Sequence, residues 1–550
     1  MKLLAFVGAA ISINTPKEDT LTFIEKFVNI SEESKNYGAG ELNKLVDDAY
    51  LRYNMSNKEI IRLSSLTFAY NILYFTKNKG AAFVPKSLFR VGVINVLKKG
   101  GLKKRKIGNE YIIIQVEGCI IKEITEEMLV NYFKGYLKQL IGGFTFEFLG
   151  IHYQISENLI NEIYLRDGHN IFNKNCLRNL PVHEEPILKD TKNEMYFFFK
   201  NGLVTLSVDG IKKEDWQEKK GFCIWADQVI QHDFNWIEDF SESYFYKFLC
   251  NVTDNDDDRK LSMYTAIGYL LHHYFKESEG QAVLFYDQTI TDITAPMGGS
   301  GKGLIFNAIK CVRNVTKIDG KLLDYNSRFK WELITPSTQV VWIDDVRPDF
   351  DFAMLHSNLT DGWTVERKYK PQFYVAPKDS PKPGLCSNSI LKGGGSTNKR
   401  RQFPIELSDY YSKQIKIGTE QPIEKEHGCI FFSAAWSEKE WNMFYCVMME
   451  CGRSYLQHGL KAHNGINVEL NRFRQTTDPD FASWVVEQNF EKLERYETKK
   501  YYSEYTNIYY GDSLKLSQRK FTSYLKAFSI YKSWTFNITP SNGISYFLFH

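Results

Sequence analysis

Six residues near the middle of the chain, Gly298-Gly299-Ser300-Gly301-Lys302-Gly303, decide how the rest of the sequence is interpreted. Closely spaced glycines let a backbone curl until successive N–H groups point at phosphate oxygens. Lys302 would supply positive charge to the β- and γ-phosphates of a nucleotide. The apolar run at 304–309 predicts a helix whose N-terminus adds its positive dipole to the same site. The stretch therefore predicts the phosphate loop of an α/β nucleotide-binding domain.

Two positions depart from the pattern G-x-x-x-x-G-K-[ST] that such loops follow. Pro296 stands where the first glycine is expected, and Gly303 stands where the serine or threonine is expected. The missing hydroxyl removes the usual direct Mg²⁺ ligand. Either water replaces it, or magnesium binding depends more strongly on acidic residues downstream. A glycine-rich turn with one lysine is a weak pattern by itself, so the interpretation needs support elsewhere.

The support comes from the apolar stretch 339–345, which ends in the two carboxylates Asp344 and Asp345. We expect a buried strand that delivers both acids to the carboxyl edge of a sheet, where α/β folds bind ligands. Asp344 would hold the Mg²⁺ shell through water, and Asp345 would orient the water that attacks ATP. A strand that runs into an Asp-rich turn is the plain alternative. The separation of 42 positions between Lys302 and Asp344 suits one intervening helix and one strand.

Basic residues are concentrated in the sixty positions that follow. Residues 361–420 contain 11 Lys and Arg against 6 Asp and Glu, and this excess is larger than the net charge of +3 of the whole chain. Within this segment, alternating basic and bulky residues after a turn predict a hairpin with a positive tip. The basic residues of that tip are Arg367, Lys368 and Lys370.

Two polar features come after the predicted hairpin. Residues 382–388 predict a short strand that ends in the side chain of Asn388. Arg400 and Arg401 stand just before a second apolar strand. A basic strip beside an ATP site favours a nucleic-acid substrate.

Composition excludes several classes of protein. Of the 550 residues, 43% are hydrophobic and 25% charged, which is typical of a folded globular chain. The nine cysteines form no C-x-x-C pair, so we predict neither a zinc ribbon nor a disulfide framework, and we expect a cytoplasmic setting. We interpret the apolar stretch 3–13 as a buried segment, because a signal-peptide cleavage region is missing. No apolar run approaches the roughly 20 residues of a membrane span, so we expect no membrane partner.

The predicted fold class is a multidomain α/β chain with a central ATPase core, helical flanking domains and a C-terminal winged helix. The expected domains are a mostly helical region (1–95), an α+β region of unknown role (96–235), a helical collar (236–280), the core (281–425), a second helical region (426–495) and a winged-helix-like domain (496–550). In the last domain, Ser517 is expected to cap a helix that is followed by a hairpin. A small α/β unit of another kind would give the same pattern.

The ordered set of motifs resembles the superfamily III helicases, which are AAA-plus ATPases with a phosphate loop. Within them, it is most similar to the poxvirus-type and the phage or plasmid primase-helicases. In that family the phosphate loop, acidic strand, basic hairpin, sensor strand and arginine finger come in the same order. Here Pro296 to Arg401 spans 106 positions. The resemblance covers residues 281–410 well and the flanking regions more loosely.

The resemblance implies a role for each motif. The phosphate-loop lysine and the acidic pair keep the roles given above. Arg367, Lys368 and Lys370 match the pore hairpin that grips DNA, and Asn388 matches the sensor that positions the nucleophilic water. The implied activity is ATP-dependent unwinding at a replication fork during viral, phage or mobile-element DNA replication. The implied cofactors are ATP and Mg²⁺, and the implied partners are single-stranded DNA and a separate primase or polymerase.

The arginine pair links activity to assembly in this family. One of Arg400 and Arg401 would reach the ATP of the neighbouring subunit, so the resemblance implies a homo-hexamer. The plain alternative is a surface pair that grips nucleic acid or a local carboxylate such as Glu406. Glu406 stands where the subgroup often has proline, which is a minor departure. The departure at Gly303 is more serious, because it implies weak or altered ATP turnover.

Two other classes of function share part of the pattern. A P-loop ATPase switch would have the loop and the acidic strand, but it does not need a basic hairpin and a nearby arginine pair. A DNA-binding replication initiator without robust unwinding would explain Gly303. Residues 1–235 contain no h-h-h-D-h-D strand that would indicate a primase and no His-x-His nicking motif. DNA-stimulated ATP hydrolysis separates the classes, since only the helicase combines it with strand displacement.

Overall fold

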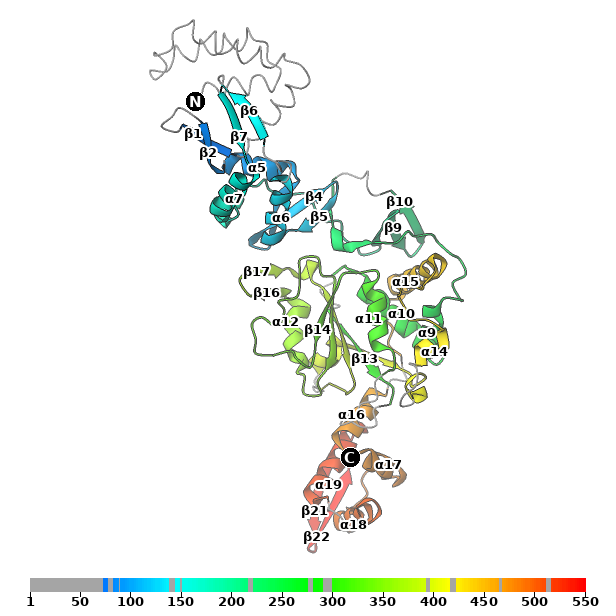
Figure 1. Ribbon diagram of the computed structural model, residues 1–550. Helices are drawn as coiled ribbons and strands as arrows, with labels where there is room; N and C mark the ends of the chain where they lie inside the picture. Colours follow the sequence, from blue (N-terminus) through cyan, green and yellow to red (C-terminus); the bar gives the residue numbers. More distant parts are fainter. Residues whose placement is uncertain are drawn as a thin grey trace. The chain divides into compact units, whose positions relative to one another are not determined.

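The structure is a computed structural model, shown in Figure 1. It describes residues 73–77, 83–88, 90–137, 144–148, 151–215, 221–275, 280–289, 299–391, 396–415, 422–463, 467–510 and 516–550. The chain divides into two compact units, and the division falls mainly at residues 183 and 184. Within the described ranges, no helix combines the length and the apolar character that a bilayer crossing requires.

The first unit is a small α+β assembly. The elements described up to residue 183 are β1 (Leu73–Lys77), β2 (Phe83–Leu88), α5 (Arg90–Lys99), β3 (Leu102–Ile107), β4 (Glu110–Glu117), β5 (Ile120–Glu123), α6 (Glu126–Leu137), β6 (Phe144–Phe148), β7 (Ile151–Ile155), α7 (Glu157–Ile171) and α8 (Lys174–Leu177). Fully buried side chains of α5 and α6, among them Leu97 and Phe133, form its core.

The prediction of a mostly helical region over 1–95 falls largely outside the described residues, as does the interpretation of residues 3–13. Where the structure describes this region, β1 and β2 form an antiparallel pair instead of a helix, whereas residues 90–95 are helical as predicted and begin α5. Pro85, within the second strand, explains the difference, because proline lacks the N–H that a helix interior needs. The strand Met195–Phe199, within the predicted α+β region, belongs to the second unit.

The second unit begins with a mixed four-stranded sheet, in which one pair of strands is parallel, a further short strand and two helices. The strands are β8 (Met195–Phe199), β9 (Gly202–Ser207), β10 (Gly210–Glu214), β11 (Ile224–Trp225) and β12 (Val229–Ile230), and the helices are α9 (Tyr244–Val252) and α10 (Asp257–Leu271). Asp256 caps α10 by accepting a hydrogen bond from the Arg259 N–H. Both helices pack against α15 (Glu438–His458), which comes almost 200 residues later in the sequence.

A parallel sheet of five strands forms the centre of the second unit. Its order is β14-β15-β18-β13-β19. The strands are β13 (Ala282–Asp287), β14 (Val315–Asp319), β15 (Val340–Val346), β18 (Lys382–Ser387) and β19 (Gln402–Leu407). Every residue of β13 and β18 is buried, as expected for a parallel sheet that is covered on both faces. The predicted mixed α/β class is thus present in this unit.

Side chains of alternate residues in β13 enter different cores. Val283 and Phe285 pack on the face covered by α9, α10, α15 and α11 (Lys302–Lys310). Leu284 and Tyr286 pack on the opposite face, with α12 (His356–Thr360) and the hairpin β16 (Trp363–Arg367) and β17 (Lys370–Val375). Figure 1 shows α10 and α11 on one side of the sheet and α12 on the other.

The C-terminal part has a core of its own. Its elements are α16 (Val468–Thr476), α17 (Pro479–Glu487), β20 (Tyr496–Glu497), α18 (Thr498–Tyr509), α19 (Gln518–Tyr531), β21 (Phe536–Ser541) and β22 (Ile544–Phe549), and α14 (Pro422–His427) precedes them. The Ser517 cap and the helix–hairpin order are confirmed. The buried rings of Phe473 and Phe481 join this core, so it begins well before the predicted boundary at residue 496.

Candidate functional site

The carboxyl ends of three neighbouring strands carry the polar residues of the candidate site. Register pairs Phe285 of β13 with Cys386 of β18, and Ile343 of β15 with Leu385 of β18. Because the strands are parallel, Asp287, the acids at 344–345 and Asn388 all lie at one edge of the sheet. The predicted phosphate loop leads from the same edge into α11, which begins at Lys302.

The described part of the loop has the backbone that glycine permits. Gly301 is the N-cap of α11 and has a φ of +102°, and Gly299 has a φ of +95°. A Cβ added to Gly301 would lie 2.6 Å from the buried ring of Phe248. A larger residue is therefore excluded here by both conformation and space. Pro296 and Gly298 lie outside the described residues.

Lys302 is buried and paired with an acid that the sequence analysis missed. Its side chain is 9% exposed, and its Nζ lies 2.5 Å from Oδ2 of Asp287 and 3.4 Å from Oγ of Ser300. Asp287 ends the apolar strand β13 in the same way that Asp344 and Asp345 follow the apolar start of β15. That shared pattern was visible in the sequence, and it would have identified Asp287 as a third acid of the edge.

The acidic pair sits in a distorted part of β15. The register with β18 shifts between Ile343 and Val346, and Asp345 has a φ of +53°. Such a conformation costs a non-glycine residue about 1–3 kcal/mol and is held only by its surroundings. Asn388 helps to fix this conformation, because its Nδ2 donates a hydrogen bond of 3.2 Å to Oδ1 of Asp345. The structure thus brings together the predicted catalytic acid and the predicted sensor.

Two lysines from β14 and the turn after it neutralise the acids. Nζ of Lys317 lies 2.7 Å from Oδ2 of Asp344, and Lys321 forms an ion pair with Asp345. The hydrogen bond to Asp345 raises the pKa of Lys321. Both lysine side chains are more than half exposed, so they leave the acids accessible to a ligand.

Cys386 lies close to several charged residues of the site. Burial raises the pKa of its thiol, and the nearby charges of Asp344, Lys302 and Asp287 act on it as well. Residues from three strands and one helix are therefore close enough to interact electrostatically. Among the described residues, no three His, Cys, Asp or Glu side chains form a preformed metal site. A cation here would take part of its ligands from phosphate and water.

The predicted basic hairpin is present as β16 and β17. Val365 pairs with Phe373 and Arg367 with Lys370, which leaves Lys368 and Tyr369 at the tip. The Lys370 side chain lies outside the described residues. Tyr369 has a φ of +58° and is fully exposed, and it was not among the predicted DNA-binding residues. An exposed ring between basic residues is suited to stacking on a nucleic-acid base.

The arginine pair lies at the opposite edge of the sheet. Arg401 ends the short helix α13 (Ser396–Arg401), and the next residue, Gln402, pairs with Ala282 at the start of β13. Nε2 of Gln281 donates to the Arg400 carbonyl at the same edge. A six-residue strand is roughly 17 Å long, which is beyond the reach of an arginine side chain. The structure does not bring either arginine to the phosphate loop of its own chain.

Glu406, the alternative partner considered for the arginines, has other neighbours. Burial raises the pKa of Glu406 to about 7, while the Asn467 backbone and Arg259 favour its charged form. With Arg259 and His463 it lines a small cavity of about 70 Å³. The arginine pair ends α13, five and six positions before Glu406 in the sequence.

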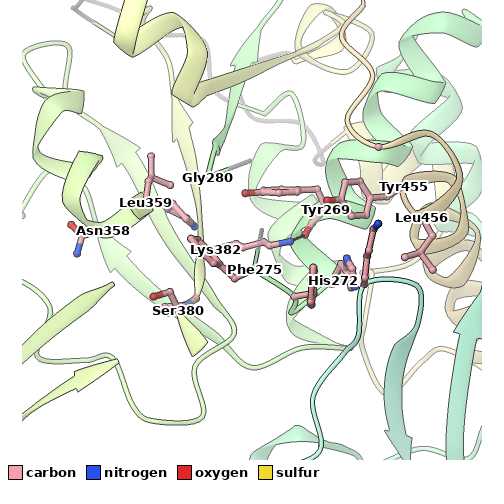
Figure 2. Close-up of a pocket in the computed structure, with 15 residues that line it drawn as sticks. Tyr269, His272, Phe275, Gly280, Asn358, Leu359, Ser380, Lys382, Tyr455 and Leu456 are labelled. Carbon is pink, nitrogen blue, oxygen red and sulfur yellow. Dashed lines mark hydrogen bonds between the residues drawn. The ribbon is translucent and has the colours of Figure 1, made fainter. Parts of the chain in front are cut away.

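A larger cavity, of about 180 Å³, opens at the amino-terminal edge of the sheet. Figure 2 shows the rings of Tyr269 and Tyr455 beside Lys382 in its wall. The Lys382 ammonium donates to the Tyr269 carbonyl at 2.9 Å and lies 3.9 Å from the centre of the Tyr269 ring. A whole strand separates this cavity from the phosphate loop, so it is not part of the candidate site.

Helix α16 connects the carboxyl edge to the C-terminal part. The side chain of Gln475 bonds both the N–H and the carbonyl of Ile390, two residues after Asn388. Nδ2 of Asn471 donates to the carbonyl of Gln288, the residue after Asp287. The first helix of the C-terminal core is thus fixed to the ends of two strands that form the site.

Comparison with known proteins gives a weak likeness. No protein family model and no curated protein matches the chain. Three solved apo structures of the C-terminal region of NrS-1 are similar, at 13–15% sequence identity and TM-scores of 0.33–0.36. Each match covers 83% of this chain and 98–99% of that chain. These TM-scores are too low to establish a common fold, so the functional proposal rests on the residues alone.

The buried pair leads to a prediction about stability. Lys302→Met should lower the stability of the ligand-free core by about 3–5 kcal/mol, because Asp287 stays buried without its counter-charge. The double variant Lys302→Met/Asp287→Asn should recover most of this loss. Native-state hydrogen exchange at the amides of α11 measures the effect. As a control, Lys317→Met removes an exposed pair and should cost only about 0–1 kcal/mol. Equal losses in the single and double variants would contradict the prediction.

Proposed function

We propose that the protein is an ATP-dependent DNA helicase of the superfamily III type, from a virus, phage or mobile element. It would move along single-stranded DNA as a homo-hexameric ring. The observation that carries the proposal is the carboxyl edge of the central sheet, where Lys302 at the start of α11, the bulged acids 344–345 and Asn388 all lie. On this view the second unit is a P-loop AAA-plus core, and the C-terminal part is its winged-helix domain.

The chemistry of the edge suits ATP hydrolysis. Lys302 and the first N–H groups of α11 would bind the phosphates. Asp345, with Asn388 donating to it, would hold and polarise the attacking water. Mg²⁺, when bound, would neutralise charge on the β- and γ-phosphates. Asp344 fits its shell, since the carboxylate lies near the strand end and the side chain that pairs with it among the described residues is the half-exposed Lys317.

The hairpin supports single-stranded DNA as the polymer that ATP turnover acts on. Its tip carries Lys368 and the fully exposed ring of Tyr369, next to Arg367. Cations bind the phosphate backbone and an exposed ring stacks on bases, and this combination is typical of sequence-independent binding to single strands.

The position of the arginines supports a ring. If one of these arginines is a finger, it would have to serve the phosphate loop of a neighbouring subunit, because it cannot reach the loop of its own chain. Arg400 and Arg401 precede β19 at the amino-terminal edge, away from their own loop. A finger supplied by the neighbour therefore requires assembly for hydrolysis.

One observation favours a second candidate, a DNA-binding replication initiator without robust unwinding. Gly303 gives the loop no hydroxyl for magnesium, which implies slow turnover. The two candidates differ in the rate of ATP hydrolysis with DNA present, because an initiator would bind ATP and DNA but show little DNA-stimulated hydrolysis.

The ATP site is tested by two substitutions. Lys302→Ala should abolish hydrolysis and weaken nucleotide binding, because the cation at the phosphates is lost. Asp345→Asn should keep nucleotide affinity but lose hydrolysis, because an amide cannot polarise water in the same way. Steady-state ATPase rates with and without single-stranded DNA, together with calorimetric nucleotide affinities, measure both. Normal hydrolysis by Asp345→Asn would move the catalytic acid elsewhere.

The hairpin should govern binding of DNA. Lys368→Ala/Lys370→Ala should weaken single-stranded DNA binding, erase unwinding and lower the salt slope by about 0.7 for each lost phosphate contact. Fluorescence anisotropy over a range of salt concentrations measures this effect. The control Lys425→Ala/Lys439→Ala removes two exposed charges from α14 and α15. If both double variants had the same salt slope as the unchanged protein, the DNA path would lie away from the hairpin.

The arginines are tested by mixing subunits. One of Arg400→Ala and Arg401→Ala should be inactive alone while binding ATP normally, because a finger in trans contributes about 10³–10⁵ in rate. Mixed with inactive Lys302→Ala protein, it should regain hydrolysis, since an intact site can then meet an intact finger. ATPase rates of the mixture measure the recovery.

Native mass spectrometry of the mixture serves as the control, because it verifies that both variants enter the same rings. Verified mixed rings without any recovery would count against a finger in trans. Full activity of both single variants and of the double variant would remove the two arginines from the mechanism.

A further inference from the structure

The phosphate loop lacks a group that the chemistry of its metal needs, and the fold leaves room for that group. Gly303 has no hydroxyl, and a Cβ added there would lie 3.8 Å from the ring of Trp342, which is an ordinary contact distance. Crowding therefore does not explain the glycine. Water or another residue must fill the chemical role of the hydroxyl if the site binds magnesium with its nucleotide.

Asp287 is the acid that stands at the loop without a complete set of partners. The residue is 7% exposed, and its Oδ2 contacts Lys302. None of the described residues donates a hydrogen bond to its Oδ1. A buried carboxylate oxygen that accepts no hydrogen bond destabilises the fold, and a ligand that donates a hydrogen bond to it would remove this penalty. Asp287 is also close enough to Cys386 to act on it, as Asp344 and Lys302 are.

We propose that Asp287 belongs to the magnesium shell of the nucleotide site and takes the place of the hydroxyl that Gly303 lacks. The proposal rests on the function proposed above, since it requires an ATP–magnesium complex at this edge. Asp287 then has a different partner in each state. In the ligand-free protein it neutralises Lys302. With the complex bound, Lys302 turns to the phosphates and Asp287 accepts hydrogen bonds from water on the cation.

Because Lys302 must exchange Asp287 for the phosphates, a nucleotide without magnesium should bind weakly. Such a nucleotide must take Lys302 away from Asp287 and leaves the buried carboxylate uncompensated beside the phosphates. Both effects oppose binding. The complex with magnesium brings its own counter-charge for Asp287. Asp287 therefore makes binding depend on the divalent cation more steeply than a hydroxyl in the loop would.

The test measures the magnesium enhancement, defined as the Kd of a non-hydrolysable ATP analogue without Mg²⁺ divided by its Kd with Mg²⁺. Isothermal titration calorimetry gives both constants without relying on turnover. Asp287→Asn should lower the enhancement about 10–100-fold, which is the usual effect of losing an outer-shell partner of a metal. Its Kd without Mg²⁺ should stay the same or decrease, because Lys302 is released and a negative charge is gone.

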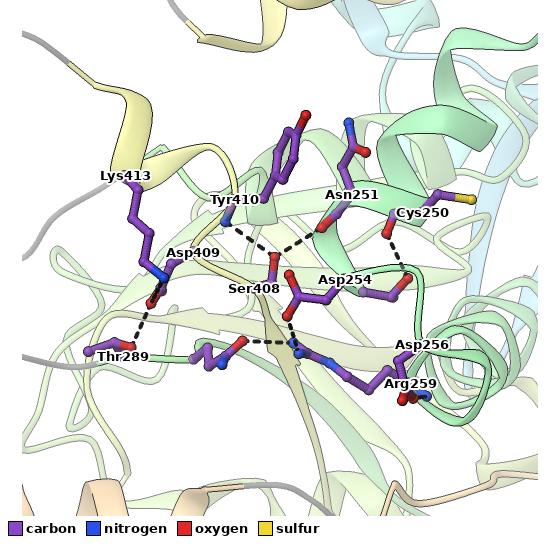
Figure 3. A network of polar contacts seen from close by, with 12 residues as sticks. Cys250, Asn251, Asp254, Asp256, Arg259, Thr289, Ser408, Asp409, Tyr410 and Lys413 are labelled. Atoms are coloured by element: carbon purple, nitrogen blue, oxygen red, sulfur yellow. Dashed lines mark hydrogen bonds and ion pairs between the residues drawn. The ribbon is translucent and has the colours of Figure 1, made fainter.

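A second substitution restores the missing group. Gly303→Ser has room for its side chain. In the Asp287→Asn background it should regain part of the enhancement. The matched control is Asp409→Asn, which removes an acid from the same edge two positions after β19. Figure 3 shows Asp409 beside Thr289 and Lys413, which contact it at 2.6 and 3.7 Å. That variant should keep the full enhancement.

The outcomes distinguish a failure of the proposed role of Asp287 from a failure of the proposed ATPase function. If the unchanged protein binds no analogue with or without Mg²⁺, the proposed function fails. If it binds with an enhancement that Asp287→Asn leaves unchanged, only the role of Asp287 fails. If Asp287→Asn is too unstable to titrate, Asp287→Glu keeps the charge and should retain most of the enhancement. Loss of affinity by Asp287→Glu to the same extent with and without Mg²⁺ would assign Asp287 a purely structural role.

Discussion

The buried ion pair between Lys302 and Asp287 is the interaction on which the rest of the site depends. Two charges that are each about nine-tenths buried must attract one another strongly enough to offset the cost of leaving water. The pair also joins the first turn of α11 to the end of the central strand β13. The two elements that would hold a nucleotide are therefore fixed to each other before any nucleotide arrives. Whatever binds here must replace Asp287 as the partner of Lys302.

The same edge carries backbone strain at the position of the proposed catalytic acid. The register shift in β15 and the positive φ of Asp345 are unfavourable in isolation. They persist because the surrounding strands are packed on both faces and Asn388 donates to the carboxylate. The bulge turns the side chain of Asp345 outward, whereas a regular β15 would direct it into the core. The parallel sheet keeps the site rigid, and the one irregular position in β15 sets the direction of the Asp345 side chain.

The sequence predicted the parts of the site that depend on local pattern. The glycine loop, the acids after the apolar strand at 340, the hairpin and Asn388 all follow from short stretches, and the structure bears out their strands and helix. Asp287 was not predicted, although it ends the apolar strand β13 in the same way that the acidic pair follows the apolar start of β15. The boundary near residue 496 could not be predicted, since the packing of Phe473 and Phe481 against α19 is a contact between distant segments. The placement of Arg401 at the far edge depended likewise on strand order, which no local pattern contains.

Strand order also explains how the C-terminal part is coupled to the site. Asp287 and Asn388 end neighbouring strands, and the residues just after them are held by two side chains of one helix, α16. Because Gln475 bonds both the N–H and the carbonyl of Ile390, the helix cannot slide along that segment without losing both hydrogen bonds. A change at either strand end must therefore break these bonds or move α16. The helix is part of the C-terminal core through Phe473, so such a movement would be carried to that core as a whole.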